Sequence, residues 1–558
     1  MGSPVSATTD DILSLIDVFF EKIYPLPSYA FLHPATTKKR CRDGLVHRPL
    51  AQAIAALTVF YTAREREPAS QWIQDAEQTI WENLEQPSIP RLQTLLLVIH
   101  YRMELGNFQR AFMLAAIAAR FAAAMRLNHE RPDLDPIARE VRRRIVWSLK
   151  IVERYFSIGL PEFELCPFET IYLDLPIPEE EFGADEAGDY GAYSLHVRLE
   201  SVRRDIMKLN RGVALCDQPF PLLTKVIYDV ERDLREIGSR MPSGTNLSVD
   251  EISGLLDNPW LPRRILVLIS WHQCHCDLYR LLLRGYPEAA PSIVIDAANP
   301  NYIATAERAC LRHAISIVQI LTNLNQQSTR HHLLEYDTAI CAYHATRLIL
   351  YISRSGKTTN RPSPEFAKSR ADLTLAALKR FFPSSALANP IIEELQRILR
   401  LFSQQNHTAA RTVHTSIFHS HDPQQQILPS PIEARQRLAI HSLLRQAEFP
   451  HDDEDEQIVT REEGGNINTR GDGTSRTWPS HSSAMASSGI AIGDQSIYTS
   501  TMNPESLASG QIGSAVRAED GWIFDSLVPD QNENWQFPLF ASFGRQDLDS
   551  FFEPATGP

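Results

Sequence analysis

The segment WHQCHC, at residues 271–276, holds the densest group of side chains that could do chemistry. It places His272, Cys274, His275 and Cys276 within five positions, and imidazole and thiolate groups are common zinc ligands. On a helix, His272 and Cys276 share a face because they are four positions apart, whereas Cys274 points elsewhere. Two or three ligands are too few for a closed structural zinc site, so we expect buried helix positions filled by small thiols and hydrogen-bonded histidines.

Patterns typical of catalysis are absent from the sequence. It contains no nucleophile elbow, no phosphate-binding loop and no zincin motif. The seven cysteines are scattered, mostly within helical patterns, which is unlike the disulfide framework of a small secreted protein. We therefore predict that this chain has no catalytic residue, no bound cofactor and no metal ion of its own.

The segment EVRRRIVWSLKIVERYFSIGLP, residues 140–161, carries the densest basic run in a chain whose formal net charge is -13. Such a run can hold DNA phosphates or stabilise the fold. Residues 162–190 contain ten acidic side chains and no lysine or arginine, and these acids would compete with phosphates for the arginines. We therefore predict an intramolecular charge network, with DNA contact as the alternative. The predicted members of the network are Glu140, Arg142, Arg143, Arg144 and Arg154.

The apolar residues of the same segment predict a helix that is buried on two sides. At about 100° per residue, five of them share one face, and Trp147 and Ile151 lie nearly opposite. The five residues of the first face are Val141, Ile145, Leu149, Val152 and Phe156. The arginines thus border buried surface, where a cation needs a partner.

Helical spacing of apolar residues extends from position 10 to about position 402, which predicts an all-α fold, a large helical bundle or irregular helical array. Beyond that point, glutamine runs, acidic runs and a Gly/Ser/Thr-rich stretch predict a disordered C-terminal tail, with one helical pattern at 432–449. The expected parts are a flexible N-terminus at 1–9, the two halves of a helical body at 10–190 and 191–402, a disordered linker at 403–519 and an acidic-aromatic segment at 520–558.

The acidic-aromatic segment interleaves eight aromatic residues with acids, which keep aromatic anchors solvated and accessible to a partner. This pattern favours an activation segment, and the alternative is a strip that docks on the helical body. The aromatic residues are Trp522, Phe524, Trp535, Phe537, Phe540, Phe543, Phe551 and Phe552.

A second basic cluster, KKRCR at residues 38–42, is a candidate nuclear import signal. Its cationic residues are Lys38, Lys39, Arg40 and Arg42. Because short basic clusters are also common at solvated helix starts, a plain surface role is the alternative.

Four ordered blocks of the sequence resemble the regulatory "middle homology" domain of fungal zinc-cluster transcription factors. They lie at residues 12–34, 118–130, 140–161 and 172–182. A further block at 269–288 also resembles that family, so the resemblance extends over about residues 10 to 400. Arg154 matches the family pattern, whereas Glu153 stands where aspartate is common. The resemblance implies an all-helical regulatory domain of a nuclear protein.

The sequence departs from the family at the DNA-binding module. Family members usually carry an N-terminal cluster of six cysteines that binds two zinc ions, and this sequence contains no pair of C-x2-C motifs. We therefore expect no zinc cofactor in this chain. Either it is a natural variant without its own DNA-binding module, or its true start lies upstream of Met1.

Together these features predict a transcriptional regulator of the fungal zinc-cluster type that controls a metabolic pathway or a biosynthetic gene cluster. Its expected partners are the transcription machinery or a coactivator, through the C-terminal tail, and a homo- or heterodimer partner. DNA would be contacted only indirectly or through an unseen N-terminal module, and no membrane contact is expected. The alternative is a helical adaptor or repressor that lacks DNA binding and acts through a related transcription factor. A helical enzyme ranks lowest.

Overall fold

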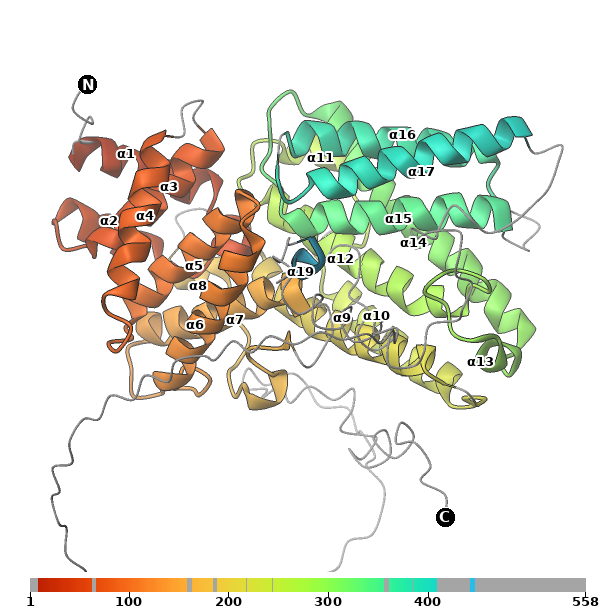
Figure 1. The fold of residues 1–558 in the computed structure, drawn as a ribbon, viewed down its shortest axis with the longest axis horizontal. Helices are drawn as coiled ribbons and strands as arrows, with labels where there is room; N and C mark the ends of the chain where they lie inside the picture. Colours follow the sequence, from red (N-terminus) through yellow and green to blue (C-terminus); the bar gives the residue numbers. More distant parts are fainter. Residues whose placement is uncertain are drawn as a thin grey trace, which may run out of the picture. The chain divides into compact units, whose positions relative to one another are not determined.

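A computed structural model describes residues 9–62, 67–157, 163–183, 188–216, 218–242, 244–355, 361–383, 385–408 and 442–446. Within these ranges every regular element is an α-helix or a short 3-10 helix, so the predicted all-α fold is confirmed (Figure 1). Most of the predicted linker and all of the acidic-aromatic segment lie outside the described residues. No described helix combines the length and the apolar character that a bilayer span requires.

The first half of the body contains helices up to residue 182. They are α1 (Thr9–Lys22), η1 (Pro27–Tyr29), α2 (Pro34–Arg42), α3 (Arg48–Thr62), α4 (Glu67–Trp81), α5 (Ile89–Glu104), α6 (Phe108–Ala124), α7 (Pro136–Ser157), η3 (Phe168–Thr170) and α8 (Glu179–Phe182). Local sequence sets several of these boundaries. At α2, for example, the His33 side chain accepts a hydrogen bond from the backbone of Thr36, and Pro34 occupies the first helical position.

The second half contains the remaining helices of the described residues. They are α9 (Ala192–Ala214), α10 (Leu223–Ser239), α11 (Val249–Leu255), α12 (Leu261–Tyr279), η4 (Arg280–Leu282), α13 (Ser292–Asp296), α14 (Pro300–Gln327), α15 (Tyr336–Ser355), α16 (Pro364–Phe381) and α17 (Asn389–Thr408), with a short α19 (Leu443–Gln446) further along the chain. Helix α17 thus runs six residues beyond the predicted end of the body at 402.

Helix α12 forms the centre of the second half. It packs against α9, α10, α14 and α15, and every residue from Leu261 to Tyr279 except Arg264 is buried. A helix that is covered on all sides shows little amphipathic pattern, which is why its sequence mixes apolar residues with histidine, cysteine and arginine. The segment WHQCHC therefore lies in the core.

Helix α7 joins the two halves, because it packs against η1, α5 and α6 of the first half and against α9 of the second. Ile145, Leu149 and Phe156 on its first predicted face are fully buried, and Trp147 and Ile151 on the opposite face are at most 2% exposed. The prediction of a helix buried on two sides is confirmed, so every charged side chain along its middle has to find a partner within the protein.

Candidate functional site

The arginine run of α7 separates into side chains with different surroundings. Arg143 reaches Glu130 at 2.8 Å, Glu140 at 2.5 Å and Asp174 at 3.3 Å. Arg142 instead donates to the backbone carbonyl of Met125 at 3.0 Å. The structure thus brings Arg143 together with acids, two of them outside its own helix, whereas Arg142 lies half-buried beside a carbonyl.

Arg144 belongs to a cluster of six buried side chains, the Glu179 cluster. Its members are Tyr24, Glu140, Arg144, Glu179, Asp189 and Arg263. Oε1 of Glu179 accepts hydrogen bonds from both Arg144 and Arg263, each at 2.7 Å, and Oε2 accepts one from the Tyr24 hydroxyl at 2.8 Å. One carboxylate at the start of α8 therefore holds α7 and α12 together.

The hydrogen bonds of the Glu179 cluster are almost complete. Arg144 donates through Nε to Glu140 at 2.7 Å and through Nη2 to the carbonyl of Ile177 at 2.8 Å. Arg263 donates through Nε to the carbonyl of Pro25 and through Nη2 to that of Tyr24. Every nitrogen of both guanidinium groups thus has an acceptor. Within the described ranges, Oδ2 of Asp189 is the one buried polar atom of this cluster that lacks a hydrogen-bond partner.

These pairings decide the charge state of Glu179. Burial on its own would raise the pKa of its carboxyl, but Arg263 and Arg144 outweigh burial and lower the pKa below its usual value. Glu179 is therefore ionised, and removing it would leave two buried guanidinium groups without their shared partner.

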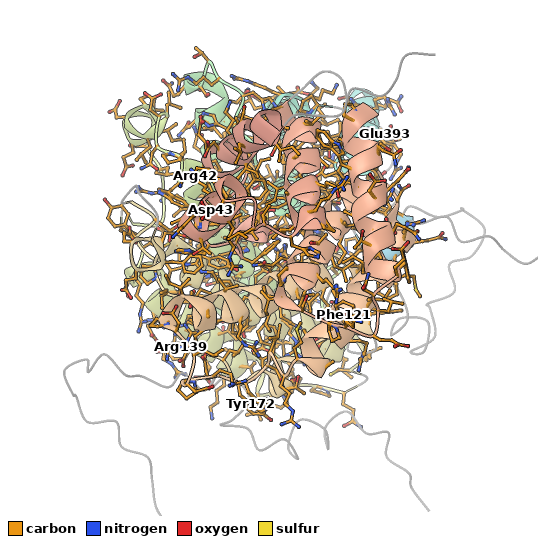
Figure 2. All side chains as sticks on the ribbon, turned by 90° about the vertical axis from the view of Figure 1, so that its left-hand side faces the viewer. Arg42, Asp43, Phe121, Arg139, Tyr172 and Glu393 are labelled. Carbon is orange, nitrogen blue, oxygen red and sulfur yellow. The ribbon has the colours of Figure 1, made fainter. Side chains whose placement is uncertain are left out.

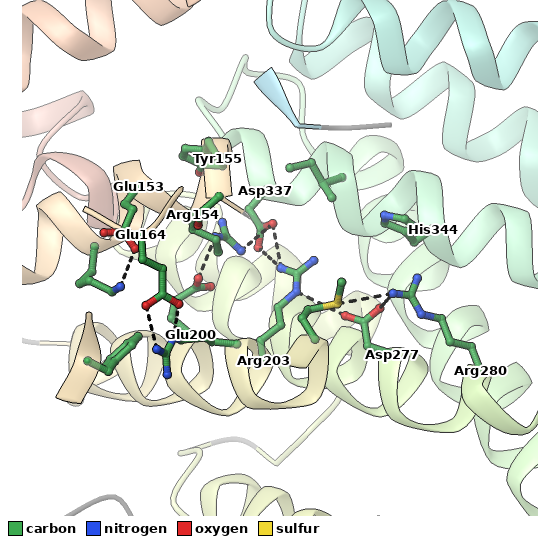
Figure 3. Close-up of a pocket in the computed structure, with 16 residues that line it drawn as sticks. Glu153, Arg154, Tyr155, Glu164, Glu200, Arg203, Asp277, Arg280, Asp337 and His344 are labelled. Atoms are coloured by element: carbon green, nitrogen blue, oxygen red, sulfur yellow. Dashed lines mark hydrogen bonds and ion pairs between the residues drawn. The ribbon is translucent and has the colours of Figure 1, made fainter. Parts of the chain in front are cut away.

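Arg154, three turns further along α7, belongs to a second cluster of six, the Asp337 cluster. Its members are Arg154, Glu200, Arg203, Asp277, Arg280 and Asp337, contributed by α7, α9, α12, η4 and α15 (Figure 3). Asp337 accepts from Arg154 at 3.0 Å and from Arg203 at 2.9 Å through both carboxylate oxygens. Nε of Arg154 lies 2.8 Å from Oε2 of Glu200.

The hydrogen bonds of the Asp337 cluster are incomplete. Among the residues that the structure describes, Nη2 of Arg154, Oε1 of Glu200 and Nε of Arg280 are buried and have no hydrogen-bond partner. The ion pairs that Asp277 makes are also long, 3.4 Å to Arg203 and 3.2 Å to Arg280. Buried polar groups are rarely left unpaired in folded proteins, so these atoms are positioned to bind water or a ligand.

A cavity of about 60 Å³ adjoins these atoms. Its walls come from the end of α7, the segment 163–168, α9, the α12–η4 junction and α15. The charged side chains that line it are the acids Glu153, Glu164, Glu200, Asp277 and Asp337 and the bases Lys150, Arg154, Arg203, Arg204 and Arg280. The cavity is therefore the candidate binding site of the helical body.

The two carboxylates that contact Arg154 have opposite pKa shifts. Burial would raise the pKa of Asp337, but Arg154 and Arg203 outweigh it and hold the pKa well below the usual range. Burial does raise the pKa of Glu200, because Arg154 offsets only part of the desolvation. Asp337 is thus the fixed anion of the cluster, and Glu200 is a carboxyl group with spare hydrogen-bonding capacity.

Two further contacts connect this region to distant parts of the chain. Glu335, just before α15, accepts hydrogen bonds from the backbone and hydroxyl of Ser28 at 2.8 and 3.0 Å, and burial raises its pKa to about 7. Ser442, just before α19, is fully buried and donates to the carbonyl of Phe156 at 3.0 Å. Leu443 is also fully buried. The chain beyond the body is therefore attached at the end of α7, beside the cavity.

The histidines of WHQCHC make core contacts. Nε2 of His272 lies 2.8 Å from the carbonyl of Thr245, and its Nδ1 lies 2.9 Å from Nδ1 of His313. The ring of His275 stacks on that of His313 at 4.2 Å, and Cys274 is fully buried, as predicted. In the part of the chain that the structure describes, no group of three or more His, Cys, Asp or Glu side chains could hold a metal ion.

Sequence reasoning missed most of the Asp337 cluster. Of its six members, only Arg154 is predicted as a network residue, since the other five lie on α9, α12, η4 and α15 and no short sequence spacing connects them to α7. A weak signal exists in Arg203, which follows the apolar Val202 within an otherwise regular amphipathic pattern. A charge at such a position indicates burial but does not identify a partner.

The candidate import residues lie on α2. Lys39, Arg40 and Arg42 are exposed, and Figure 2 labels Arg42 at the end of the helix. Lys38 is half-buried and pairs with Asp17 at 3.3 Å. The eight aromatic residues of the predicted activation segment lie outside the described residues.

Comparison with known proteins finds a family model that matches part of the chain. Residues 16–209 match the family model of the fungal specific transcription factor domain. This region begins within α1 and ends within α9, so it contains the arginine run, Glu179 and Glu200. The match covers the part of the chain in which the resemblance was strongest.

Curated relatives give matches of similar length. The chain is 28% identical over 191 residues to the Zn(2)-C6 fungal-type transcription factor FTF1c of Fusarium oxysporum f. sp. lycopersici, which is 30% of this chain and 20% of that protein. It is 28% identical over 185 residues to FTF2 of the same organism, 29% of this chain and 17% of that protein. An uncharacterized transcriptional regulatory protein of Schizosaccharomyces pombe is 26% identical over 196 residues, 32% and 20% of the two chains.

These alignments span about a fifth of the length of each relative. No solved structure matches the chain. The matched proteins are all named as transcription factors or transcriptional regulators, which agrees with the prediction of a regulatory rather than an enzymatic protein.

Proposed function

We propose that this chain, which carries a fungal specific transcription factor domain at residues 16–209, acts in the nucleus as a transcriptional regulator of the zinc-cluster type. The family match is the observation that carries the proposal. By analogy with that family, the regulator controls a metabolic pathway or a biosynthetic gene cluster.

We assign no direct DNA binding to the helical body. The densest basic run lies on α7, where Arg143 and Arg144 are at most 6% exposed and are paired with acids of the same chain. Phosphate contacts need uncompensated cations on a surface. DNA contact is therefore assigned to a zinc-cluster module outside this sequence or to a homo- or heterodimer partner, and this chain binds no zinc of its own.

The output of the regulator is assigned to the acidic-aromatic segment at 520–558. Its aromatic side chains are the anchors for the transcription machinery or a coactivator. The contact of Ser442 and Leu443 with the body supports this assignment, because it attaches the chain that leads to the segment at one defined point on α6 and α7. Entry into the nucleus is assigned to the exposed cations of α2.

A reporter assay tests the proposal. The full chain, fused to an unrelated DNA-binding domain, is expected to activate a reporter, because the fusion brings the chain to the promoter whatever its own DNA contact is. The same fusion with the eight tail aromatics replaced by alanine is the matched control, and it should lose most of the activation. If the fusion does not activate the reporter and instead inhibits a related full-length transcription factor, the chain acts as the alternative adaptor or repressor.

The Leu443→Asp variant tests the attachment of the tail. A carboxylate in this fully buried position should detach α19, since an unpaired buried charge is strongly unfavourable. If the attachment holds the tail back, the reporter signal rises. Leu45→Asp is the control, because Leu45 is exposed, and it should leave the reporter signal unchanged.

A further inference from the structure

The cavity beside the Asp337 cluster is electrically balanced. Five acidic and five lysine or arginine side chains line it. Most of them are deeply buried, with Asp277 at 2% and Arg280 at 4% exposure of their side chains. A ligand with a net charge would leave one charge uncompensated in these surroundings, which is costly. The balance favours a ligand that is neutral overall.

The unpaired atoms demand a ligand with both donors and acceptors. Nη2 of Arg154 is a donor without an acceptor, and Oε1 of Glu200 is an acceptor without a donor, among the described residues. The two groups are neighbours, because Nε of Arg154 and Oε2 of Glu200 lie 2.8 Å apart. A ligand that pairs with both protein atoms therefore carries a hydrogen-bond acceptor and a donor close together. If the ligand's acceptor is negatively charged and its donor is positively charged, both hydrogen bonds are stronger.

The size of the cavity limits the ligand to a few heavy atoms. Its volume of about 60 Å³ is far below the roughly 300–1,000 Å³ of pockets for drug-sized molecules. Apolar surface on its walls comes from Tyr155, Met207 and Ile340. These side chains suit a short aliphatic group and exclude a long one.

We propose that this cavity binds a free α-amino acid with a short aliphatic side chain. Its ammonium group donates to Oε1 of Glu200, and its carboxylate accepts from Nη2 of Arg154. An α-amino acid carries both charges on one carbon, is neutral overall and is small, so it meets the three requirements together. The inference goes beyond the proposed role in transcription, and it is measured on purified protein without DNA.

Isothermal titration calorimetry on the full chain tests the proposal. The probes are glycine, L-alanine, L-serine and L-proline, each titrated up to about 10 mM. At least one should bind with a stoichiometry of one. Propionate lacks the ammonium group and ethylamine lacks the carboxylate, so each should bind at least about tenfold more weakly than L-alanine. Equal binding of propionate would overturn the proposal in favour of a simple anion site.

Three variants locate the site. Glu200→Gln removes the charge that receives the ammonium group, so affinity should fall at least about tenfold. Met207→Phe fills the cavity without removing a charge and should abolish binding. Glu236→Gln is the matched control on α10, since Glu236 is 45% exposed and pairs with Arg198 away from the cavity. It should change affinity less than about twofold.

Circular dichroism and thermal unfolding check that each variant is folded. Two different substitutions in the cavity and one control outside it separate loss of the site from loss of the fold. Binding that survives both Glu200→Gln and Met207→Phe would place the ligand elsewhere and overturn the proposal. Absence of heat with every amino acid would mean that the cavity holds water alone, which overturns it as well. Failure of the reporter assay with amino acid binding intact would instead count against the proposed function only.

Discussion

The Glu179 cluster and the Asp337 cluster are both built around buried arginine and carboxylate side chains, and they differ in how completely those side chains are paired. In the first, each nitrogen of Arg144 and Arg263 has an acceptor. In the second, Arg154, Glu200 and Arg280 each keep a buried atom with no hydrogen-bond partner among the described residues, and a cavity adjoins them. Both clusters receive an arginine from α7, so the difference lies in what the other helices contribute.

This difference separates a structural role from a binding role. Paired buried charges mainly fix one arrangement of helices, and their net contribution to stability is small until one partner is removed. Unpaired buried atoms beside a cavity have unused interaction free energy, which a ligand can recover. The substitutions below test whether the two clusters respond as this distinction requires.

The largest effect is expected for Glu179→Gln in the Glu179 cluster. The substitution leaves Arg144 and Arg263 buried without their shared anion, and breaking a buried ion pair in this way costs about 3–5 kcal/mol. Denaturant unfolding measures the loss. The neighbouring Glu181→Gln, at an exposed position, is the control and should change stability by less than about 0.5 kcal/mol.

Asp337→Asn is the equivalent substitution in the other cluster, and we expect a loss of about 2–4 kcal/mol. The loss is smaller because the arginines paired with Asp337 are less deeply buried: the side chains of Arg154 and Arg203 are 18% and 8% exposed, whereas those of Arg144 and Arg263 are fully buried. Asp372→Asn, which affects an exposed pair with Lys368, serves as the control in the same unfolding series. A larger loss at Asp337 than at Glu179 would reverse the ranking of the two clusters.

The pH dependence of stability should report Glu335, whose buried carboxyl has a pKa raised to about 7. The folded state binds this proton more tightly than the unfolded state, so the stabilisation is complete below about pH 4.5 and is lost as the pH rises through about 7. The glutamine of Glu335→Gln is neutral at every pH. The free energy of unfolding of this variant, relative to that of the wild type, should therefore rise by about 1–3 kcal/mol between about pH 4.5 and about pH 7. Glu393→Gln, at an exposed position, is the control and should show no such rise. If the stability difference between Glu335→Gln and the wild type also does not change with pH, Glu335 is ionised throughout this range.

The smallest effect on stability is expected for Glu200→Gln, a loss of about 1 kcal/mol, because the substitution weakens a single interaction. Glu200 makes one ion pair, with Arg154, and Arg154 keeps its pair with Asp337 at 3.0 Å when Glu200 is replaced, so no buried cation is left without a partner. The unfolding free energy of this variant, set beside that of Glu179→Gln, sharpens the comparison. A loss as large as that of Glu179→Gln would assign Glu200 to the scaffold.

The helices and the local part of the charge network could be predicted from sequence because both depend on short spacings. The two buried faces of α7 follow from a repeat of 3.6 residues, and Glu140 contacts Arg143 and Arg144 at i+3 and i+4. The acidic content of residues 162–190 also indicated partners for the arginines, and Asp174 and Glu179 lie there.

The tertiary part of both clusters could not be predicted, because no local rule connects its members. Arg263 is 84 positions from Glu179, and Arg203 is 134 positions from Asp337. Arg263 lies among apolar helix residues, which indicates that it is buried, whereas Arg203 shares its helix face with Glu200 and gives only a weak signal. The partner of each arginine depends on how the helices pack, and a single sequence does not contain that information in readable form. The same holds for the cavity, whose walls come from five separate segments.

The most direct test of the account is a high-resolution crystal structure of the protein, with electron density examined at both clusters. In crystals grown with the amino acid that binds, we expect that molecule, rather than water alone, bonded to Oε1 of Glu200 and Nη2 of Arg154, and direct side-chain contacts with nothing inserted around Glu179. A structure in which Glu200 and Arg154 turn to satisfy each other fully and the cavity closes would contradict the account.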